Sequence, residues 1–121
     1  MVTLKRDIVK YIRDKAKNKY AKGSECYICG GKEKLDFHHY YTLAPLVHRW
    51  VQKNDLNPMY VLAFREDFIE DHHDELYVHT VTLCHTHHRQ LHKVYGRDPG
   101  LGTADKQKHW VEIQRETHGM V

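Results

Sequence analysis

The chain has 121 residues, enough for one domain, and a formal net charge of +3, so the distribution of charge tells more than its sum. The mean hydropathy of −0.74 and the lack of any apolar run near the roughly 20 residues that span a bilayer exclude a membrane protein. The sequence turns charged at Lys5 and Arg6, so we expect no signal peptide and a cytoplasmic protein with reduced cysteines.

Residues 3–21 are predicted to form a basic amphipathic helix, because Leu4, Ile8 and Ile12 recur at helical spacing. Thr3 can cap the start of this helix, and Gly23 is expected to follow its end. Eight Lys or Arg residues lie between positions 5 and 22, against two Asp residues. This distribution suits a surface that contacts phosphates, although a solvated basic face explains the charge as well.

A short strand is predicted over residues 35–39. Its alternation buries Leu35 and Phe37 on one face and turns Asp36 and His38 to the other. His39 lies where the strand breaks.

Two amphipathic helices are expected next. Thr42 can cap the first, whose apolar residues have helical spacing: Leu43, Leu46, Val47, Trp50 and Val51. Asn57 and Pro58 open the second in the favoured order of cap and first-turn proline. This helix carries an acidic run and turns these residues inward: Val61, Phe64, Phe68 and Ile69.

The C-terminal half is expected to contain a strand and two helices. Residues 77–83 alternate and are rich in β-branched side chains, which predicts a strand leading into a turn at Cys84. A helix over residues 87–95 would then end at Gly96. The last predicted helix covers residues 103–117 and carries Trp110 and Ile113.

The cysteines are spaced for metal binding. Two residues separate Cys26 from Cys29, and two separate Cys84 from His87, which lets each pair grip one tetrahedral ion. Together they predict a Cys3His site for structural Zn²⁺. A redox pair at the first two cysteines is the alternative, but it leaves the matching downstream pair unexplained.

Histidines are concentrated near the second ligand pair. His88 and His92 are four residues apart and share a helix face that differs from the face of the zinc ligands. Closing the zinc site would bring the tandem His38 and His39 toward that face. Because adjacent strand residues point opposite ways, one of these two can bind metal while the other acts as a general base. Phosphodiester hydrolysis requires this combination.

The combined pattern Cys-x2-Cys, Asp-Phe-His-His and Leu-Cys-x2-His-His-x3-His, over residues 24–95, resembles the HNH (ββα-metal) endonucleases, especially the small zinc-knuckle type of phages. The resemblance implies an α+β fold whose ββα-metal core is stapled by the Cys3His knuckle and surrounded by helices, in a single domain over residues 1–121. It implies a phosphodiester hydrolase acting on DNA that leaves a 5′ phosphate and a 3′ hydroxyl. His87 replaces the usual fourth cysteine, which zinc tolerates.

The resemblance also implies roles for individual histidines. His38 and His88 would bind the catalytic divalent ion, and His39 would be the general base. His92 would be a further ligand or a phosphate contact. His79 stands where the family has an asparagine that ties the metal loop together, and it would take that role or become a ligand.

The expected partner is DNA, and Arg89, Lys93 and Arg97 flank the predicted site, where they would contact phosphates or only solvent. The catalytic ion would be Mg²⁺ or Mn²⁺, and two imidazoles also admit Co²⁺ or Ni²⁺. The sequence leaves nicking and double-strand cleavage both open. A monomer, which is the favoured state, has one active site and would nick one strand, whereas a dimer formed through the basic helix would make double-strand breaks or cut branched junctions. His72 and His73 are expected to form a solvated helix end.

The alternative to an endonuclease is a non-catalytic, zinc-stapled nucleic-acid-binding or adaptor protein. Such a module has no need of a free histidine beside a metal, so His39→Ala would leave its affinity unchanged. A phage origin, which the resemblance implies, would place the protein in the host cell cytoplasm.

Overall fold

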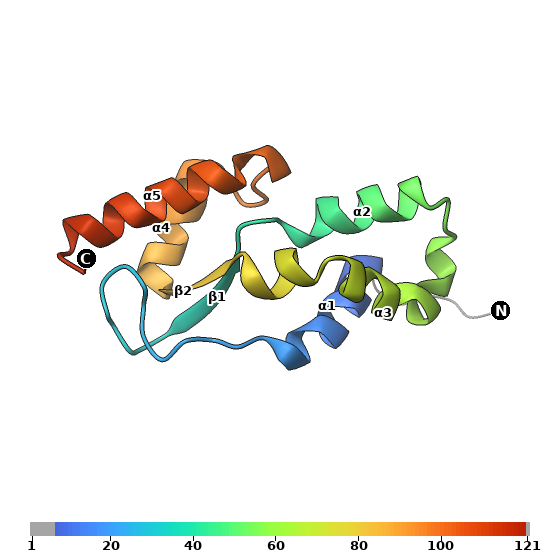
Figure 1. The fold of residues 1–121 in the computed structure, drawn as a ribbon, viewed down its shortest axis with the longest axis horizontal. Coiled ribbons are helices and arrows are strands. Elements are labelled where there is room, and N and C mark those ends of the chain that lie inside the picture. Colours follow the sequence, from blue (N-terminus) through green and yellow to red (C-terminus); the bar gives the residue numbers. More distant parts are fainter. Residues whose placement is uncertain (1–6, 121) are drawn as a thin grey trace.

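In the computed structural model, which describes residues 7–120, helices surround a small two-stranded sheet (Figure 1). The class is α+β, as predicted. The main elements are α1 (Ile8–Ala16), β1 (Leu35–His39), α2 (Leu43–Lys53), α3 (Val61–Asp71), β2 (Thr80–Cys84), α4 (His85–Tyr95) and α5 (Ala104–Thr117). No helix in the described range is long and apolar enough to cross a membrane.

The two strands pair antiparallel, although α2 and α3 lie between them in the sequence. The register sets Leu35 opposite Cys84 and His38 opposite Val81. Because α4 begins directly after β2, this pairing also brings β1 against α4. The result is a strand-strand-helix unit, with α5 packed on α4.

Buried apolar side chains form two clusters. The helices α1, α2 and α3 lie toward one end of the molecule, and α4 and α5 lie toward the other (Figure 1). The first, the helical core, joins α1, α2 and α3, and its fully buried members include Ile12, Val47 and Phe68. The second, the hairpin core, joins the cysteine turn, the sheet, α4 and α5, and its members include Ile28, Leu83, Leu91 and Val111.

The first helix is shorter than predicted. Asp7 caps its start by accepting the amide of Val9 at 2.8 Å, and the predicted cap, Thr3, lies outside the described residues. After α1 and a short 3-10 turn, the backbone becomes extended at Tyr20. The helix does not reach residue 21 because Tyr20 stacks on Phe37 of β1, with ring centroids 4.7 Å apart.

The second and third helices form where predicted, with changes at their starts. Thr42 precedes α2, but its hydroxyl donates to the carbonyl of Pro99 at 2.6 Å instead of capping the helix. Asn57 caps as predicted, but the segment Pro58–Tyr60 is a 3-10 turn and α3 starts after it. The bond from Thr42 ties the start of α2 to the loop before α5.

The second strand is displaced from its predicted position. Instead of a strand over residues 77–83, a π-helical turn covers Asp74–Val78, and β2 starts only at Thr80. The turn forms because Leu76 is fully buried in the helical core and the hydroxyl of Tyr77 donates to a carbonyl of α1 at 3.0 Å. Packing against α1 thus overrides the alternating pattern.

The last two helices complete the hairpin unit, which consists of the turn that carries Cys26 and Cys29, the two strands, α4 and α5. α4 begins two residues earlier than predicted and ends at Gly96, whose φ of +92° suits glycine. α5 matches the predicted helix over residues 103–117. Its buried residues are Ala104, Gln107 and Val111, whereas Ile113 is 44% exposed.

Candidate active site

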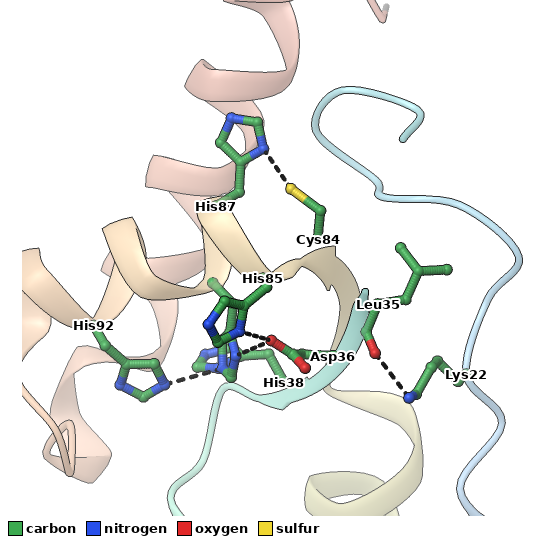
Figure 2. Close-up of polar contacts among 9 residues, drawn as sticks. Lys22, Leu35, Asp36, His38, Cys84, His85, His87 and His92 are labelled. Carbon is green, nitrogen blue, oxygen red and sulfur yellow. Dashed lines mark hydrogen bonds and ion pairs between the residues drawn. The ribbon is translucent and has the colours of Figure 1, made fainter. Parts of the chain in front are cut away.

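Four predicted ligands meet where the segment before β1 reaches the end of β2. One ligand atom of each lies within 4.8 Å of those of the other three: Cys26, Cys29, Cys84 and His87. His87 Nδ1 is 3.2 Å from Cys84 Sγ, a contact that Figure 2 marks with a dashed line, and 3.8 Å from Cys26 Sγ. Cys26 and His87 are buried. This donor set fits a tetrahedral Zn²⁺ site.

The turn that carries the first two cysteines favours the thiolate form of Cys26, whereas burial raises the pKa of the Cys29 thiol. Gly30 adopts a φ of +74°, and the amide of Cys26 donates to the carbonyl of Gly31 at 2.7 Å, which closes the turn. Burial raises the pKa of the Cys26 thiol, but backbone hydrogen bonds, from Cys84 first and then Cys29, outweigh it and hold that pKa below its ordinary value. A lowered pKa favours the metal-binding form of the thiol.

Three histidines form a second group between β1 and α4. His38 Nδ1 lies 3.1 Å from His88 Nε2, and His92 Nε2 lies 3.0 Å from the same His88 atom. His38 is 3% exposed, whereas Leu35 and Phe37, predicted to be the buried residues of the strand, are only half-buried. His38 is the buried residue because α4 packs over the face of β1 that carries it.

Two of these imidazoles turn their outer nitrogen to an oxygen atom. His88 Nδ1 is 3.1 Å from the carboxylate of Asp36, and His92 Nδ1 is 2.8 Å from the carbonyl of Gly96. Both oxygens only accept hydrogen bonds, so these nitrogens carry the protons and the two Nε2 lone pairs face each other at 3.0 Å. Facing lone pairs repel unless a cation lies between them. The residues present therefore fit a divalent metal ion.

The surroundings set the charge of this group. Burial lowers the pKa of His38 to about 3 and lowers the pKa of His88 as well. Burial raises the pKa of Asp36, but hydrogen bonds from His85 and His88 outweigh it and hold that pKa below its ordinary value. Neutral imidazoles beside an ionised carboxylate are the protonation states that metal binding requires.

His39 packs against Phe37, with ring centroids 5.1 Å apart, yet it lines the same cavity as the three histidines. Its Nε2–H donates to the carbonyl of Leu76 at 3.1 Å, which leaves Nδ1 as an acceptor. Burial lowers the pKa of His39 to about 4, so the imidazole is unprotonated near neutral pH. The cavity has a volume of about 260 Å³, and its other lining residues include His38, His88, His92, Arg13 and Arg97.

His79 is not brought into the histidine group. Its Nδ1 lies 3.1 Å from Lys108 Nζ on α5, and its ring packs edge-on against Tyr41. Its backbone carbonyl accepts the amide of Tyr40 at 3.1 Å, which continues the contact between the strands beyond His39. Within residues 7–120, its side chain is not among the ligand atoms that converge.

Cationic side chains stand on two sides of the histidine group. Arg89, Lys93 and Arg97 line a hollow beside α4, and Lys17 and Lys22 line another between the 3-10 turn after α1 and β1. All five residues are exposed. Positive charge on both sides of the cavity fits a polyanion lying across it.

The histidine group is contacted by three residues for which the sequence predicted no role: Asp36, His85 and Gln107. His85 Nδ1 lies 3.1 Å from the carboxylate oxygen of Asp36 that His88 also contacts, and Gln107 Oε1 lies 2.8 Å from His38 Nε2. The alternation of the strand does place Asp36 on the face of His38. No signal in the sequence places Gln107 there.

His72 and His73 follow α3 and were predicted to form a solvated helix end. This prediction is correct for His73 and wrong for His72. His72 is only 9% exposed, stacks on Phe68 with ring centroids 4.2 Å apart, and donates from Nδ1 to the Phe68 carbonyl at 2.9 Å. His73 is exposed and lies 3.3 Å from Asp74. Neither belongs to a converging group of ligands in the part of the chain that the structure describes.

Comparison with known proteins places the chain in a family. No solved structure matches it. The family model of the phage T5 nicking endonucleases, described as the nicking endonuclease family, matches residues 2–119, which is nearly the whole chain. The chain therefore belongs to this nicking endonuclease family and is a nuclease that acts on DNA.

Proposed function

We propose that this protein is a metal-dependent HNH endonuclease, a phosphodiester hydrolase that nicks one strand of DNA with His39 as the general base. The observation that carries the proposal is the convergence of His38, His88 and His92, whose inner nitrogens lie 3.0 and 3.1 Å apart, in the same cavity as His39. The strand-strand-helix unit that holds them has the order of elements expected of a ββα-metal core. The proposed domain spans residues 1–121, with this core over about residues 24–95.

Structural Zn²⁺ would be held by Cys26, Cys29, Cys84 and His87. These ligands come from the turn before β1, the end of β2 and the first turn of α4. A structural zinc site in a small fold contributes about 10–16 kcal/mol of folding free energy. The site would therefore fix the position of α4, and with it His88 and His92, against β1.

The catalytic divalent ion would be held by His38, His88 and His92. When bound there, the ion would stabilise negative charge on a phosphate oxygen and on the leaving 3′ oxygen. A third imidazole shifts the preference from Mg²⁺ toward Co²⁺ or Ni²⁺, because imidazole suits these later transition metals better than it suits Mg²⁺. His92 thus takes the first of its two predicted roles, that of a ligand.

His39 would remove a proton from the attacking water. Its bond to the Leu76 carbonyl fixes the ring and leaves Nδ1 free to accept that proton. The water oxygen then bonds to phosphorus as the bond to the 3′ oxygen breaks, and the 3′ oxygen takes a proton from solvent. The products are a 5′ phosphate and a 3′ hydroxyl.

DNA would be held through its phosphates, chiefly by Arg89, Lys93 and Arg97 on one side of the cavity. Binding of this kind depends strongly on salt and only weakly on sequence. A monomer offers one such site and would nick one strand of a duplex, and a phage enzyme would do so in the host cell cytoplasm.

The test is cleavage of supercoiled plasmid with Mn²⁺ or Mg²⁺ by the wild type, His39→Ala and His48→Ala. His48 is an exposed histidine of α2 and serves as the matched control. We expect open circles from the wild type and the control, and a rate at least about 100-fold lower from His39→Ala. Metal analysis should first find about one Zn²⁺ in each protein.

Failure of the folded, zinc-loaded wild type to cleave DNA with any divalent ion would overturn the proposal and leave a zinc-stapled binding protein. Linear product at the earliest times would contradict nicking by a monomer. Equal rates for His39→Ala and the control would remove His39 as the base.

A further inference from the structure

Gln107 of α5 is a fully buried polar residue that the proposed function leaves without a role. Its side chain contacts three groups: His38 Nε2 at 2.8 Å, the backbone carbonyl of Tyr40 at 3.2 Å and the hydroxyl of Thr103 at 2.9 Å. A buried amide whose atoms are all paired is held in one orientation.

The orientation of this amide follows from the chemistry of its neighbours. The carbonyl of Tyr40 can only accept, so the amide nitrogen of Gln107 must face it. The hydroxyl of Thr103 donates to the carbonyl of Gly100 at 2.7 Å, so it too acts as an acceptor toward Gln107. The amide oxygen is left to face His38 and can only accept from it.

His38 must therefore carry its proton on Nε2. Its Nδ1 keeps a lone pair, which lies 3.1 Å from His88 Nε2, inside the histidine group. With the opposite tautomer, Nε2 and the Gln107 oxygen would both be acceptors at 2.8 Å, and Nδ1 would present a proton where a metal ligand needs a lone pair. The amide thus selects the tautomer able to bind metal.

We propose that Gln107 is a positioning residue for the metal site: it fixes the ring and the tautomer of His38 so that Nδ1 is presented to a divalent cation. The inference rests on the proposed function of His38 as a ligand. With Gln107 in this role, the outer nitrogen of each imidazole donates to an oxygen atom. The acceptors are the Asp36 carboxylate for His88, the Gly96 carbonyl for His92 and the Gln107 amide oxygen for His38. Such outer acceptors commonly change metal affinity by about 10–100-fold.

The inference also gives α5 a part in the chemistry. The helix lies outside residues 24–95, and its packing on α4 explains why Val111 is buried but not why a polar residue is. Gln107 reaches from α5 to the buried face of β1, so the position of α5 sets the position of a ligand on another element.

The first test needs only the wild type. Nitrogen-15 NMR of the zinc-loaded protein, without added divalent ion, should show a proton on His38 Nε2 that exchanges slowly with water, because it is buried and bonded to Gln107. A His38 ring that carries its proton on Nδ1 alone would overturn the proposal, whatever the nuclease assay shows.

The second test separates positioning from support of the fold. Gln107→Met removes every hydrogen bond of the side chain, whereas Gln107→Glu keeps an oxygen for His38 and loses the amide donors to Tyr40 and Thr103. Gln114→Met makes the same exchange elsewhere on α5 and is the matched control. Binding of Mn²⁺, measured by the loss of the free-ion electron paramagnetic resonance signal, gives the affinity without a nuclease assay.

We expect Gln107→Met to bind Mn²⁺ about 10–100-fold more weakly than the wild type, with Gln107→Glu and Gln114→Met within about threefold of it. A purely structural role predicts instead that Gln107→Met and Gln107→Glu lose affinity together, which would overturn the proposal. A wild type that binds no Mn²⁺ would refute the proposed catalytic site itself. If Gln107→Met binds Mn²⁺ as tightly as the wild type does, only the role of Gln107 is refuted.

Discussion

The helical core and the hairpin core are built from different chemistry. The helical core consists of apolar side chains, among them Ile12, Val47 and Phe68, and the buried polar side chain that stacks on it, His72, is paired with the backbone carbonyl of Phe68. The hairpin core includes a buried cysteine and lies against buried polar side chains: His38, His87 and Gln107. Apolar burial stabilises the first without any partner, whereas buried polar groups cost free energy unless each is paired.

The helical core stabilises the fold, whereas the hairpin core carries the candidate metal ligands. The helices α1, α2 and α3 lie at one end of the molecule, and the converging ligands lie on the hairpin unit (Figure 1). We infer that the hairpin unit depends on its ions and the helical core does not. Changes in the two regions should therefore have different consequences.

Removing zinc should have the largest effect and should fall on the hairpin unit. Chelation, or Cys26→Ser, should abolish amide exchange protection in β1, β2 and α4 and lower nicking by more than about 100-fold, since structural zinc contributes about 10–16 kcal/mol. Protection in α1, α2 and α3 should persist. Hydrogen exchange read by mass spectrometry measures both regions at once, and equal loss in both would contradict the separation.

Truncating the helical core should reduce stability and spare the site. Phe68→Ala, at a fully buried position, should cost about 3–5 kcal/mol of unfolding free energy, because it leaves a cavity. Below the lowered melting temperature, Mn²⁺ affinity should match that of the wild type. Leu62→Ala, at a residue of α3 that is 53% exposed, is the control and should change stability by less than about 1 kcal/mol.

Removing the carboxylate behind His88 should weaken the site and spare the fold. Asp36→Ala should bind Mn²⁺ about 10–100-fold more weakly, because His88 Nδ1 loses the acceptor that lies 3.1 Å away. Titration of Mn²⁺ into the zinc-loaded protein measures this. The exposed Asp74 of the π-helical turn supplies the control, and an equal loss in Asp74→Ala would point to net charge instead of orientation.

The smallest effect is expected from single phosphate contacts. Lys93→Ala should reduce the slope of log affinity against log salt by about 0.9, the value for one phosphate contact on duplex DNA. Lys53→Ala, at the exposed end of α2, should leave the slope unchanged. Binding is best followed with a catalytically inactive His39→Ala background, and a slope that is the same with and without Lys93 would remove it from the interface.

The sequence predicts well what depends on local pattern. The apolar stripes of α2 and α3 and the paired spacing of Cys26–Cys29 and Cys84–His87 need no knowledge of the rest of the fold, and the structure forms both helices and brings the four ligands together. The strand at residues 35–39 also forms where its alternation predicts, but the residue that it buries is His38 and not Leu35 or Phe37.

What the sequence does not predict depends on contacts between distant residues. α1 stops early because Tyr20 stacks on β1, and residues 74–78 form a π-helical turn because Leu76 enters the helical core. Gln107 meets His38 across 69 positions of sequence, from a helix outside the motif that resembles HNH endonucleases. No periodicity or spacing encodes such a contact.

The most direct test of the central claim is anomalous X-ray diffraction from crystals of the zinc-loaded protein soaked in Mn²⁺, measured at the absorption edges of zinc and manganese. We predict a zinc peak among Cys26, Cys29, Cys84 and His87, and a separate manganese peak among His38, His88 and His92. Manganese bound elsewhere, or no ion among the three histidines, would contradict the account of a catalytic site distinct from a structural one.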